Sequence, residues 1–371
     1  MRQTLVLYSR LAFYPVHWLA LEEIVRRYDV RAIVLAAAPP ADLPTVHQAH
    51  GTADPGASPL PIEVRHVPRE SRLTRLRWIA SQLRRARPDV IWVQEEPIDP
   101  FLLEMLAMYR VRRRPRIVTA VCENIFPRPR RWAERTGRRL LWPRLDHLMT
   151  VALPSLEGIR AAGMPESVPA STLVAGGLEP TGEVRPLELP VGFTVGFAGR
   201  IVEEKGWRVL AQALPDGSRL VLAGDGPQRS ELEAFADGDD RIDYLGLLPK
   251  DELWSFYAAL DCLAVPSLTT PRWKEQSAST LVDGLCMGLP IVASDSGGIA
   301  DIMGPAGLLV PEGNPEALRE ALARLRDDAA LRQRLGALGS ERFRREFAIP
   351  AYAGKIAAAL SLHLRSVALG A

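Results

Sequence analysis

Glu275 and Asp283 are two carboxylates eight positions apart, one before and one after the point near Ser279 where the sequence predicts a helix to begin. Apolar residues 263–265 predict a buried strand that runs out into the polar loop carrying Glu275. Backbone N–H groups at a helix start, together with the positive end of the helix dipole, attract phosphate oxygens. A carboxylate in the second turn can accept hydrogen bonds from a sugar hydroxyl. The segment therefore predicts a site for a nucleotide sugar.

Two cations follow another predicted strand, at residues 193–199. Arg200 comes directly after Gly199, where that strand ends, and Lys205 stands at the expected start of the next helix. Arginine can hold a diphosphate through two parallel hydrogen bonds, whereas lysine holds it as a point charge. The alternative is a solvated basic pair, but cations are mildly unfavourable at a helix start. Their position therefore favours phosphate binding.

A glycine-rich turn follows the predicted strand at residues 219–224. It reads Gly224-Asp225-Gly226-Pro227, and glycine permits both a tight turn and a close approach of the backbone to a ligand. Arg229 stands where a dinucleotide fingerprint would have its third glycine. A ligand contact at Gly224 and a plain turn between strand and helix both remain open on this motif.

These motifs belong to a chain in which apolar strand-like runs alternate with helix-like segments from end to end. This alternation predicts an α/β fold with parallel sheets covered on both faces, and two such series predict two doubly wound domains. Ligands of such sheets bind beyond the carboxyl ends of the strands. The runs are 4–9, 31–37, 62–67, 89–95, 116–121 and 147–152 in the first half, and 193–199, 219–224, 242–246, 261–267 and 290–295 in the second.

The domain boundary is expected in residues 178–192, which are rich in Pro, Gly and Glu and lack an apolar period. We therefore expect an N-terminal acceptor-binding domain at 1–180 and a C-terminal donor-binding domain at 193–349. A final helix at 350–371 can pack back on the N-terminal domain. Residues 37–61 form a second Pro-rich stretch that is too long for a routine connection, so it is either a disordered insertion or a functional loop.

Bulk composition is that of an ordinary globular protein. At 371 residues, two domains are the default, and the three widely spaced cysteines indicate neither a disulfide framework nor a metal site. No apolar run has the length of a signal peptide core or a membrane span, so we expect a cytoplasmic protein. Residues 1–190 hold 27 Arg and 20 acids, a net of +7, and the rest holds 19 cations and 24 acids, a net of −5. Arg-rich codon usage explains much of this split, although it also suggests an anionic partner for the first half.

The second half resembles the retaining glycosyltransferases of family four, which have the GT-B architecture of two Rossmann-like domains facing a central cleft. The resemblance covers residues 195–320 almost without a gap, and the order and spacing of its pieces make it specific. The matching pieces are AGRIVEEKGW, LAGDGP, YLGLLPKDELWSFYAALDCLAVPS, EQSASTLVD, MGLPIVASDSGG and GLLVPEGNPEAL.

The resemblance implies a role for each motif. Glu275 contacts the donor sugar and acts in catalysis with Arg200 and Lys205, which hold the diphosphate, while Asp283 binds the nucleotide ribose. The chain departs from the family at Asp283, where glutamate is usual, and at Ala278, where glycine is usual. No protein nucleophile is evident, which fits same-face attack assisted by the leaving phosphate. The implied donor-binding residues are Gly199, Arg200, Lys205, Gly224, Ala278, Ser279, Thr280 and Asp283.

The first half resembles the family more loosely, as expected for a domain that binds a varied acceptor. Polar residues that follow predicted strands are the acceptor candidates, and the adjacent acids among them are costly there unless they are solvated or hydrogen-bonded. An isolated histidine is more often structural. The candidates are His17, Glu95, Glu96, Glu123 and Asn124.

Residues 128–145 combine seven arginines with tryptophan and leucine. The segment is either a surface helix with its apolar stripe in the core or a contact with an anionic membrane or lipid-phosphate acceptor. No metal-ligand spacing or nucleic-acid motif is present, so the sequence predicts no required metal or other cofactor and no nucleic-acid partner.

We therefore expect transfer of a sugar from a nucleoside-diphosphate sugar to an acceptor hydroxyl on a glycan, a lipid-linked molecule or a small natural product. Two alternatives remain open at this stage: a sugar-nucleotide epimerase of the same fold and a catalytically impaired nucleotide-sugar-binding protein. The base (UDP, GDP, ADP or dTDP), the donor sugar and the acceptor are not predicted.

Overall fold

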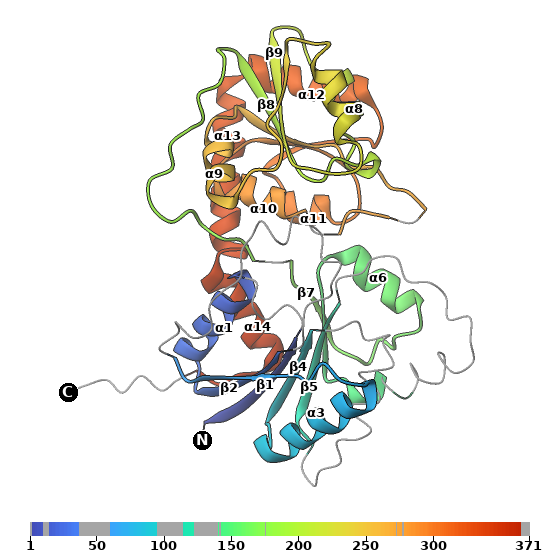
Figure 1. Cartoon of the computed structure of the whole chain (residues 1–371), viewed down its shortest axis with the longest axis vertical. Coiled ribbons are helices and arrows are strands. Elements are labelled where there is room, and N and C mark those ends of the chain that lie inside the picture. Colours follow the sequence, from blue (N-terminus) through green and yellow to red (C-terminus); the bar gives the residue numbers. More distant parts are fainter. Residues whose placement is uncertain are drawn as a thin grey trace, which may run out of the picture. The chain divides into compact units, whose positions relative to one another are not determined.

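The computed structural model describes residues 2–9, 15–36, 60–94, 114–121, 140, 142–174, 176–271, 273–276 and 278–364. These residues divide into two compact units (Figure 1). The first unit contains the described residues up to Val174 and those from Ile349 onward, and the second contains those in between, up to Ala348. The chain therefore passes from the first unit to the second and returns for its last helix.

The first unit is built on a seven-stranded sheet in which every pair of neighbours is parallel. Its spatial order is β3-β2-β1-β4-β5-β6-β7, so the order of connection reverses between β1 and β4. The strands are β1 (Gln3–Ser9), β2 (Val30–Ala36), β3 (Ile62–His66), β4 (Val90–Gln94), β5 (Arg116–Val121), β6 (His147–Thr150) and β7 (Ala170–Thr172).

Helices cover both faces of this sheet. Successive side chains of a strand point to opposite faces, and β1 carries apolar side chains on both. Leu5 and Leu7 pack in a core with α1 (Pro15–Arg27) and α14 (Ile349–Leu360), which lie side by side (Figure 1). Val6 and Tyr8 pack in a second core with α3 and α6. The remaining elements of this unit are α3 (Arg72–Ala86), α6 (Leu153–Ala161) and the 3₁₀ turn η2 (Trp142–Arg144).

The second unit has a six-stranded parallel sheet in the order β10-β9-β8-β11-β12-β13. The order of connection reverses between β8 and β11, which is where ligands of open parallel sheets bind. The strands are β8 (Phe193–Ala198), β9 (Ser218–Ala223), β10 (Ile242–Tyr244), β11 (Cys262–Val265), β12 (Ile291–Ser294) and β13 (Gly307–Val310).

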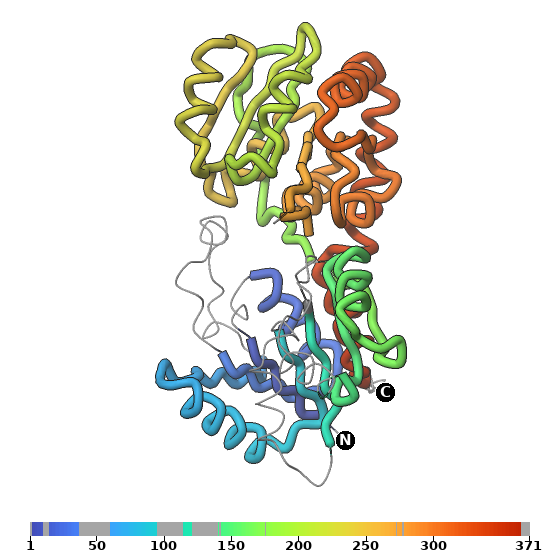
Figure 2. The backbone as a smooth tube through the Cα atoms, turned by 90° about the vertical axis from the view of Figure 1, so that its right-hand side faces the viewer, coloured from blue at the N-terminus to red at the C-terminus, as the bar shows by residue number. Residues whose placement is uncertain are grey.

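One face of this sheet packs against α7, α8, α12 and the start of α13, in a core that includes Val195, Leu220 and Leu322. On the other face, α10 lies so close that Gly284 meets the side chains of Leu263 and Ile291. The helical elements are η3 (Glu203–Lys205), α7 (Trp207–Gln212), α8 (Arg229–Ala236), α9 (Lys250–Ala258), α10 (Ser279–Cys286), α11 (Ile299–Met303), α12 (Pro315–Asp327) and α13 (Ala329–Glu346). Figure 2 follows the chain from α13 into α14, where it re-enters the first unit.

The predicted fold class is confirmed: both halves are parallel-sheet α/β units, and all eleven expected strand-like runs contain a strand. Two further strands, β7 and β13, form where the sequence suggested none. The expected linker at 178–192 has neither helix nor strand, but it belongs to the second unit, where the backbone N–H of Leu187 donates to the carbonyl of Ser255 at 3.0 Å. Among the described residues, no helix combines the length and apolar character needed to cross a bilayer.

Candidate active site

An open pocket lies in the second unit at the carboxyl ends of β8 and β9, beside α9 and α10. Its empty volume is about 530 Å³, open solvent included. Small and apolar residues form much of its wall, and polar side chains from α9 and α10 complete it. The lining residues are Ala198, Gly199, Ala223, Gly224, Leu247, Leu248, Lys250, Leu253, Tyr257, Ser279, Thr280 and Asp283.

The two loops that follow β8 and β9 are joined backbone to backbone. Gly224 has a φ of +143°, and a Cβ at that position would collide with the carbonyl oxygen of Gly199. One turn on, Ile201 donates its N–H to the Asp225 carbonyl at 2.9 Å and accepts from the Gln228 N–H at 3.1 Å. Glycine is thus required at 224 both for its backbone conformation and for close packing. The joined loops hold the backbone around Arg200 in place.

Glu275 is buried, with its residue only 4% exposed, and it is bonded to a cation. Its Oε2 accepts a hydrogen bond from Lys205 Nζ at 2.6 Å and another from Ser267 Oγ at 2.7 Å. Lys205 ends the short turn η3, and its ammonium also lies 4.9 Å from the ring centroid of Trp273. Since a buried carboxylate is costly without a partner, these bonds are what allow an acid at this position.

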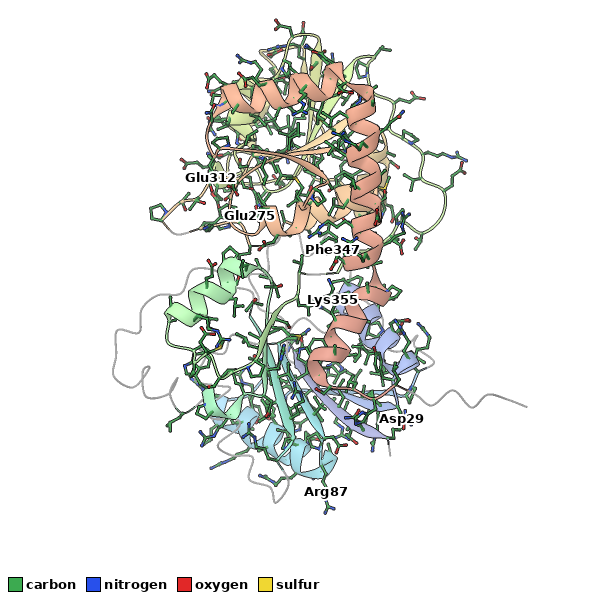
Figure 3. All side chains as sticks on the ribbon, turned by 180° about the vertical axis from the view of Figure 1, so that it is seen from behind. Asp29, Arg87, Glu275, Glu312, Phe347 and Lys355 are labelled. Carbon is green, nitrogen blue, oxygen red and sulfur yellow. The ribbon has the colours of Figure 1, made fainter. Side chains whose placement is uncertain are left out.

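The loop that carries Glu275 is held from several sides. Gly298 donates its N–H to the Glu275 carbonyl at 3.1 Å. Glu312, which follows β13, accepts from the N–H and the hydroxyl of Thr269 at 2.6 and 2.7 Å. Burial raises the pKa of Glu312, but the hydrogen bonds from Thr269 outweigh this and leave its pKa below the ordinary value. Figure 3 labels Glu275 and Glu312, both of which lie in the second unit.

Asp283 lies in the second turn of α10 and is 5% exposed, so it is not the solvated surface acid that an eight-residue spacing alone would allow. Its Oδ2 accepts from Lys250 Nζ at 2.7 Å, and the side chain of Lys250 is itself only 15% exposed. Lys250 begins α9, and its ammonium lies 4.1 Å from the ring centroid of Trp254. A second buried ion pair therefore stands on the pocket wall.

Tyr257 joins this cluster from α9. Its hydroxyl lies 3.1 Å from Thr280 Oγ1 and also hydrogen-bonds with Asp283. Burial, followed by the negative charge of Asp283, raises the pKa of Tyr257 well above 10. Its hydroxyl therefore keeps its proton at neutral pH, and that proton serves the bonds within this cluster.

Of the eight predicted donor-side residues, five line this pocket: Gly199, Gly224, Ser279, Thr280 and Asp283. Arg200, Lys205 and Ala278 are not among its lining residues, and neither is Glu275. Ala278 precedes the helix and accepts from the Leu281 N–H at 2.9 Å, whereas the N–H groups of Ser279 and Thr280 lie too early in the helix to have an acceptor within it. Arg200 follows β8 in the chain, two residues after its last residue, Ala198. It is the most exposed of the predicted cations, with 38% of its side chain accessible, and it contacts Glu204 Oε1 at 3.2 Å.

On the acceptor side, one candidate is described. His17 lies in the first turn of α1, and its ring centroid is 6.5 Å from that of Tyr352 in α14. The other four candidates, Glu95, Glu96, Glu123 and Asn124, lie outside the described residues, as does most of segment 128–145. Within the described part of the chain, no group of three or more His, Cys, Asp or Glu side chains is arranged to hold a metal ion.

The sequence did not single out Lys250, Tyr257 or Ser267. Lys250 and Asp283 are 33 positions apart, and Lys250 at the start of a helix looks like an exposed residue until α9 is packed against α10. Ser267 stands eight residues before Glu275, in a loop without periodicity. A buried carboxylate requires a cation, so the predicted acids themselves were the signal that such partners exist.

Known proteins resemble this chain in sequence and in fold. Residues 192–328 match the family model described as glycosyl transferases group 1. The fold of the chain is similar to that of Anabaena HepE, solved in complex with UDP, at a TM-score of 0.71 and 18% identity over 97% of this chain and 99% of the other. The same protein solved with UDP-glucose gives a TM-score of 0.66.

Two curated relatives come from Streptomyces. A 2-deoxystreptamine glucosyltransferase of S. kanamyceticus is 37% identical over 150 residues, which is 38% of each protein. A 2-deoxystreptamine N-acetyl-D-glucosaminyltransferase of S. fradiae is 31% identical over 231 residues, which is 57% of this chain and 50% of the relative. The chain thus spans at most half the length of either relative. Its second unit carries a glycosyl transferases group 1 domain, and its two parallel-sheet units have the fold of the GT-B glycosyltransferases.

Proposed function

We propose that the protein transfers a sugar, with retention of configuration, from a nucleoside-diphosphate sugar to an acceptor hydroxyl. The observation that carries this proposal is the pocket beside α10, whose wall combines the start of that helix, at Ser279 and Thr280, with a buried carboxylate paired to lysine. Such a combination suits a ligand that is anionic at one end and rich in hydroxyls at the other. The UDP and UDP-glucose complexes of the structural neighbour support this choice of ligand.

In this proposal, the diphosphate lies over the first turn of α10. The backbone N–H groups of residues 278–280, together with Arg200 and Lys205, face the charge that builds on the departing diphosphate. Fixed donors aimed at developing charge are commonly the largest single contribution to catalysis. Lys205 has three N–H donors, of which one is bonded to Glu275, so it retains donors for a phosphate oxygen.

Glu275 contacts the donor sugar, and Asp283 accepts hydrogen bonds from the ribose. Ser267 and Lys205 hold the carboxylate of Glu275 from one side, and the Gly298 N–H holds its backbone. A side chain fixed in this way can orient the sugar for attack on the face that the diphosphate leaves. No metal is required in the proposal, because lysine, arginine and helix N–H groups supply the positive charge.

The acceptor is assigned to the first unit. His17, Glu95, Glu96, Glu123 and Asn124 stay the candidates for binding it, and a cytoplasmic location stays part of the proposal. Because two relatives are named for 2-deoxystreptamine, that aminocyclitol belongs in the first panel of acceptors to be tested.

The test begins with thermal shift of the full chain against UDP-, GDP-, ADP- and dTDP-glucose, since a ligand at 100 times its Kd stabilises the native state by about 2.7 kcal/mol. The donor that binds is then incubated with the acceptor panel, and products are read by mass spectrometry. We expect a glycosylated acceptor, with turnover reduced at least about 100-fold in Glu275→Gln. The control is Glu341→Gln, an exposed residue of α13 in the same unit.

Three outcomes would overturn the proposal. Turnover of Glu275→Gln within about threefold of the parent chain would remove Glu275 from its role. Conversion of the donor to an isomer without any acceptor would indicate an epimerase, and binding without hydrolysis or transfer would indicate a binding protein.

A further inference from the structure

The function proposed so far gives Lys250 no contact with the ligand, yet it is one of the most enclosed cations described in the second unit. Its side chain is 15% exposed, compared with 18% for Lys205 and 38% for Arg200. It lines the same pocket as Asp283, and its ammonium bonds that carboxylate at 2.7 Å. A lysine loses hydration in such a position, so its placement on a pocket wall calls for a ligand-directed explanation.

Lys250 has more N–H donors than it has acceptors among the described residues. An ammonium has three N–H donors, and one of them is directed at Asp283 Oδ2. The face of Trp254, 4.1 Å from the nitrogen, attracts the charge without providing an oxygen acceptor. Donor capacity therefore remains on the side where Lys250 lines the pocket.

The acceptors of Asp283 also exceed its partners. A carboxylate offers about four lone-pair positions, and Lys250 and Tyr257 are the side chains that bond it in the described structure. Ammonium and carboxylate thus lie side by side, each with unused capacity towards the pocket. A group that both donates and accepts at neighbouring atoms satisfies them together, and a pair of vicinal hydroxyls has that chemistry.

We propose that Lys250 is a specificity residue which, together with Asp283, binds the two ribose hydroxyls of the donor, so that the pocket selects ribonucleoside over deoxyribonucleoside diphosphates. The inference rests on the proposed function, which left the nucleotide open. Each hydroxyl donates to the carboxylate, and at least one accepts from the ammonium. A deoxyribose leaves one of these half-buried charges short of a partner when the ligand closes over it.

The expected discrimination follows from that missing bond. A hydrogen bond to a charged group is worth enough to change affinity by about 10- to 150-fold. A fully closed site that is built to bond a hydroxyl discriminates even more strongly against a ligand that lacks this hydroxyl. For this open pocket, we expect UDP to bind about 10- to 100-fold more tightly than 2′-deoxy-UDP or 3′-deoxy-UDP. The same reasoning places dTDP-sugars among the poor donors.

A purely structural role for Lys250 predicts something different. If the ammonium only neutralises Asp283, its removal lowers the affinity for ribonucleotides and for deoxyribonucleotides by the same factor. If the ammonium bonds a hydroxyl, its removal weakens UDP more than the deoxy analogues, and the ratio of their affinities falls. The ratio therefore separates ligand recognition from the support of Asp283.

The experiment is isothermal titration of the full chain with UDP, 2′-deoxy-UDP and 3′-deoxy-UDP, repeated with GDP and 2′-deoxy-GDP. The variants are Lys250→Met and, as a matched control, Lys355→Met, an exposed residue of α14 in the first unit (Figure 3). We expect a preference of about 10-fold or more for the ribonucleotide in the parent chain and in Lys355→Met. In Lys250→Met, where the bonds to Asp283 remain, we expect the preference for the ribonucleotide to be at least about threefold smaller than in the parent chain.

Equal binding of UDP and its deoxy analogues by the parent chain overturns the inference while leaving the donor site of the proposed function intact. An unchanged ratio in Lys250→Met overturns the role of Lys250. Should Lys250→Met fail to fold, the ratio in the parent chain and in Lys250→Arg still decides the matter, because the parent measurement needs no variant. If no nucleoside diphosphate binds at all, both the proposed function and this inference fail.

Discussion

Lys205→Met removes the cation from the most buried acid of the site, and its cost can be anticipated from the structure. Lys205 Nζ lies 2.6 Å from Glu275 Oε2, and the two side chains are 18% and 5% exposed. Removing one partner of a fully buried pair costs about 3–5 kcal/mol, chiefly because the remaining charge is uncompensated. Because Lys205 retains some exposure and methionine keeps most of its aliphatic stem, we expect a loss of about 2–4 kcal/mol in the free energy of unfolding of the second unit.

The assay is urea unfolding followed by tryptophan fluorescence and circular dichroism, with hydrogen exchange by mass spectrometry on the peptides of β8 and β11. Exchange reports the opening of the second unit separately from the first. The control is Arg229→Met, which breaks an exposed pair with Glu233, with side chains 54% and 43% accessible. Exposed pairs contribute little to stability because solvent screens them, so the control should lose much less stability than Lys205→Met.

A second variant tests the physical reason for the loss. In Lys205→Met combined with Glu275→Gln, the uncompensated charge is gone while Ser267 keeps a bonding partner. We expect the double variant to recover at least about half of the stability lost in Lys205→Met. The reasoning is refuted if Lys205→Met costs no more than Arg229→Met, or if the double variant is as unstable as Lys205→Met alone.

Three further perturbations test the elements around the site. Gly297 has a φ of +55°, and the Cβ introduced by Gly297→Ala would collide with the Glu275 carbonyl. We therefore expect turnover to fall at least tenfold and the free energy of unfolding to drop by about 1–3 kcal/mol. Turnover within twofold of the parent would show that the backbone at Gly297 does not position Glu275. Glu312→Gln removes a carboxylate from the loop. Burial raises the pKa of Glu312, but the hydrogen bonds from Thr269 help to bring it below 4.5, so the parent should be more stable than the variant by a full and constant amount above pH 4.5 and by less as the pH falls below that value. A difference between the two urea midpoints that does not change with pH would refute this. Tyr257→Phe removes a hydroxyl whose pKa is raised well above 10 by burial. The parent should lose stability as the pH rises past 10, and the variant should lose less. Melting temperatures of the two proteins that fall equally with rising pH would contradict the assignment.

The helix start and the two acids of the candidate site could be located from the sequence because they lie close together in the chain. Glu275, the helix start at Ser279 and Asp283 lie within nine residues, and the helix period places Asp283 about one turn beyond Ser279. The strands were recognisable because buried parallel strands are continuous apolar runs. The short strands β7 and β13 were not, since three or four residues carry too little pattern to distinguish them from loops.

The partners of these acids could not be predicted, because pairing depends on packing between elements distant in the chain. Lys205 is 70 positions from Glu275, and Lys250 is 33 from Asp283. Sequence analysis placed Lys205 in a phosphate site without foreseeing that it also holds Glu275. It likewise had no means of showing that Glu312, beyond β13, bonds the loop that carries Glu275. Burial makes these contacts necessary for a stable fold, and only the folded structure shows which side chains are buried.

The most direct test of the account is a crystal structure of the full chain with the nucleoside diphosphate selected by thermal shift. The account predicts density in the pocket beside α10, with a ribose hydroxyl within about 3 Å of a carboxylate oxygen of Asp283. It also predicts phosphate oxygens at the first-turn N–H groups of α10 and within reach of Lys205. A nucleotide bound elsewhere, or bound with its phosphates directed away from that helix start, would contradict the central claim.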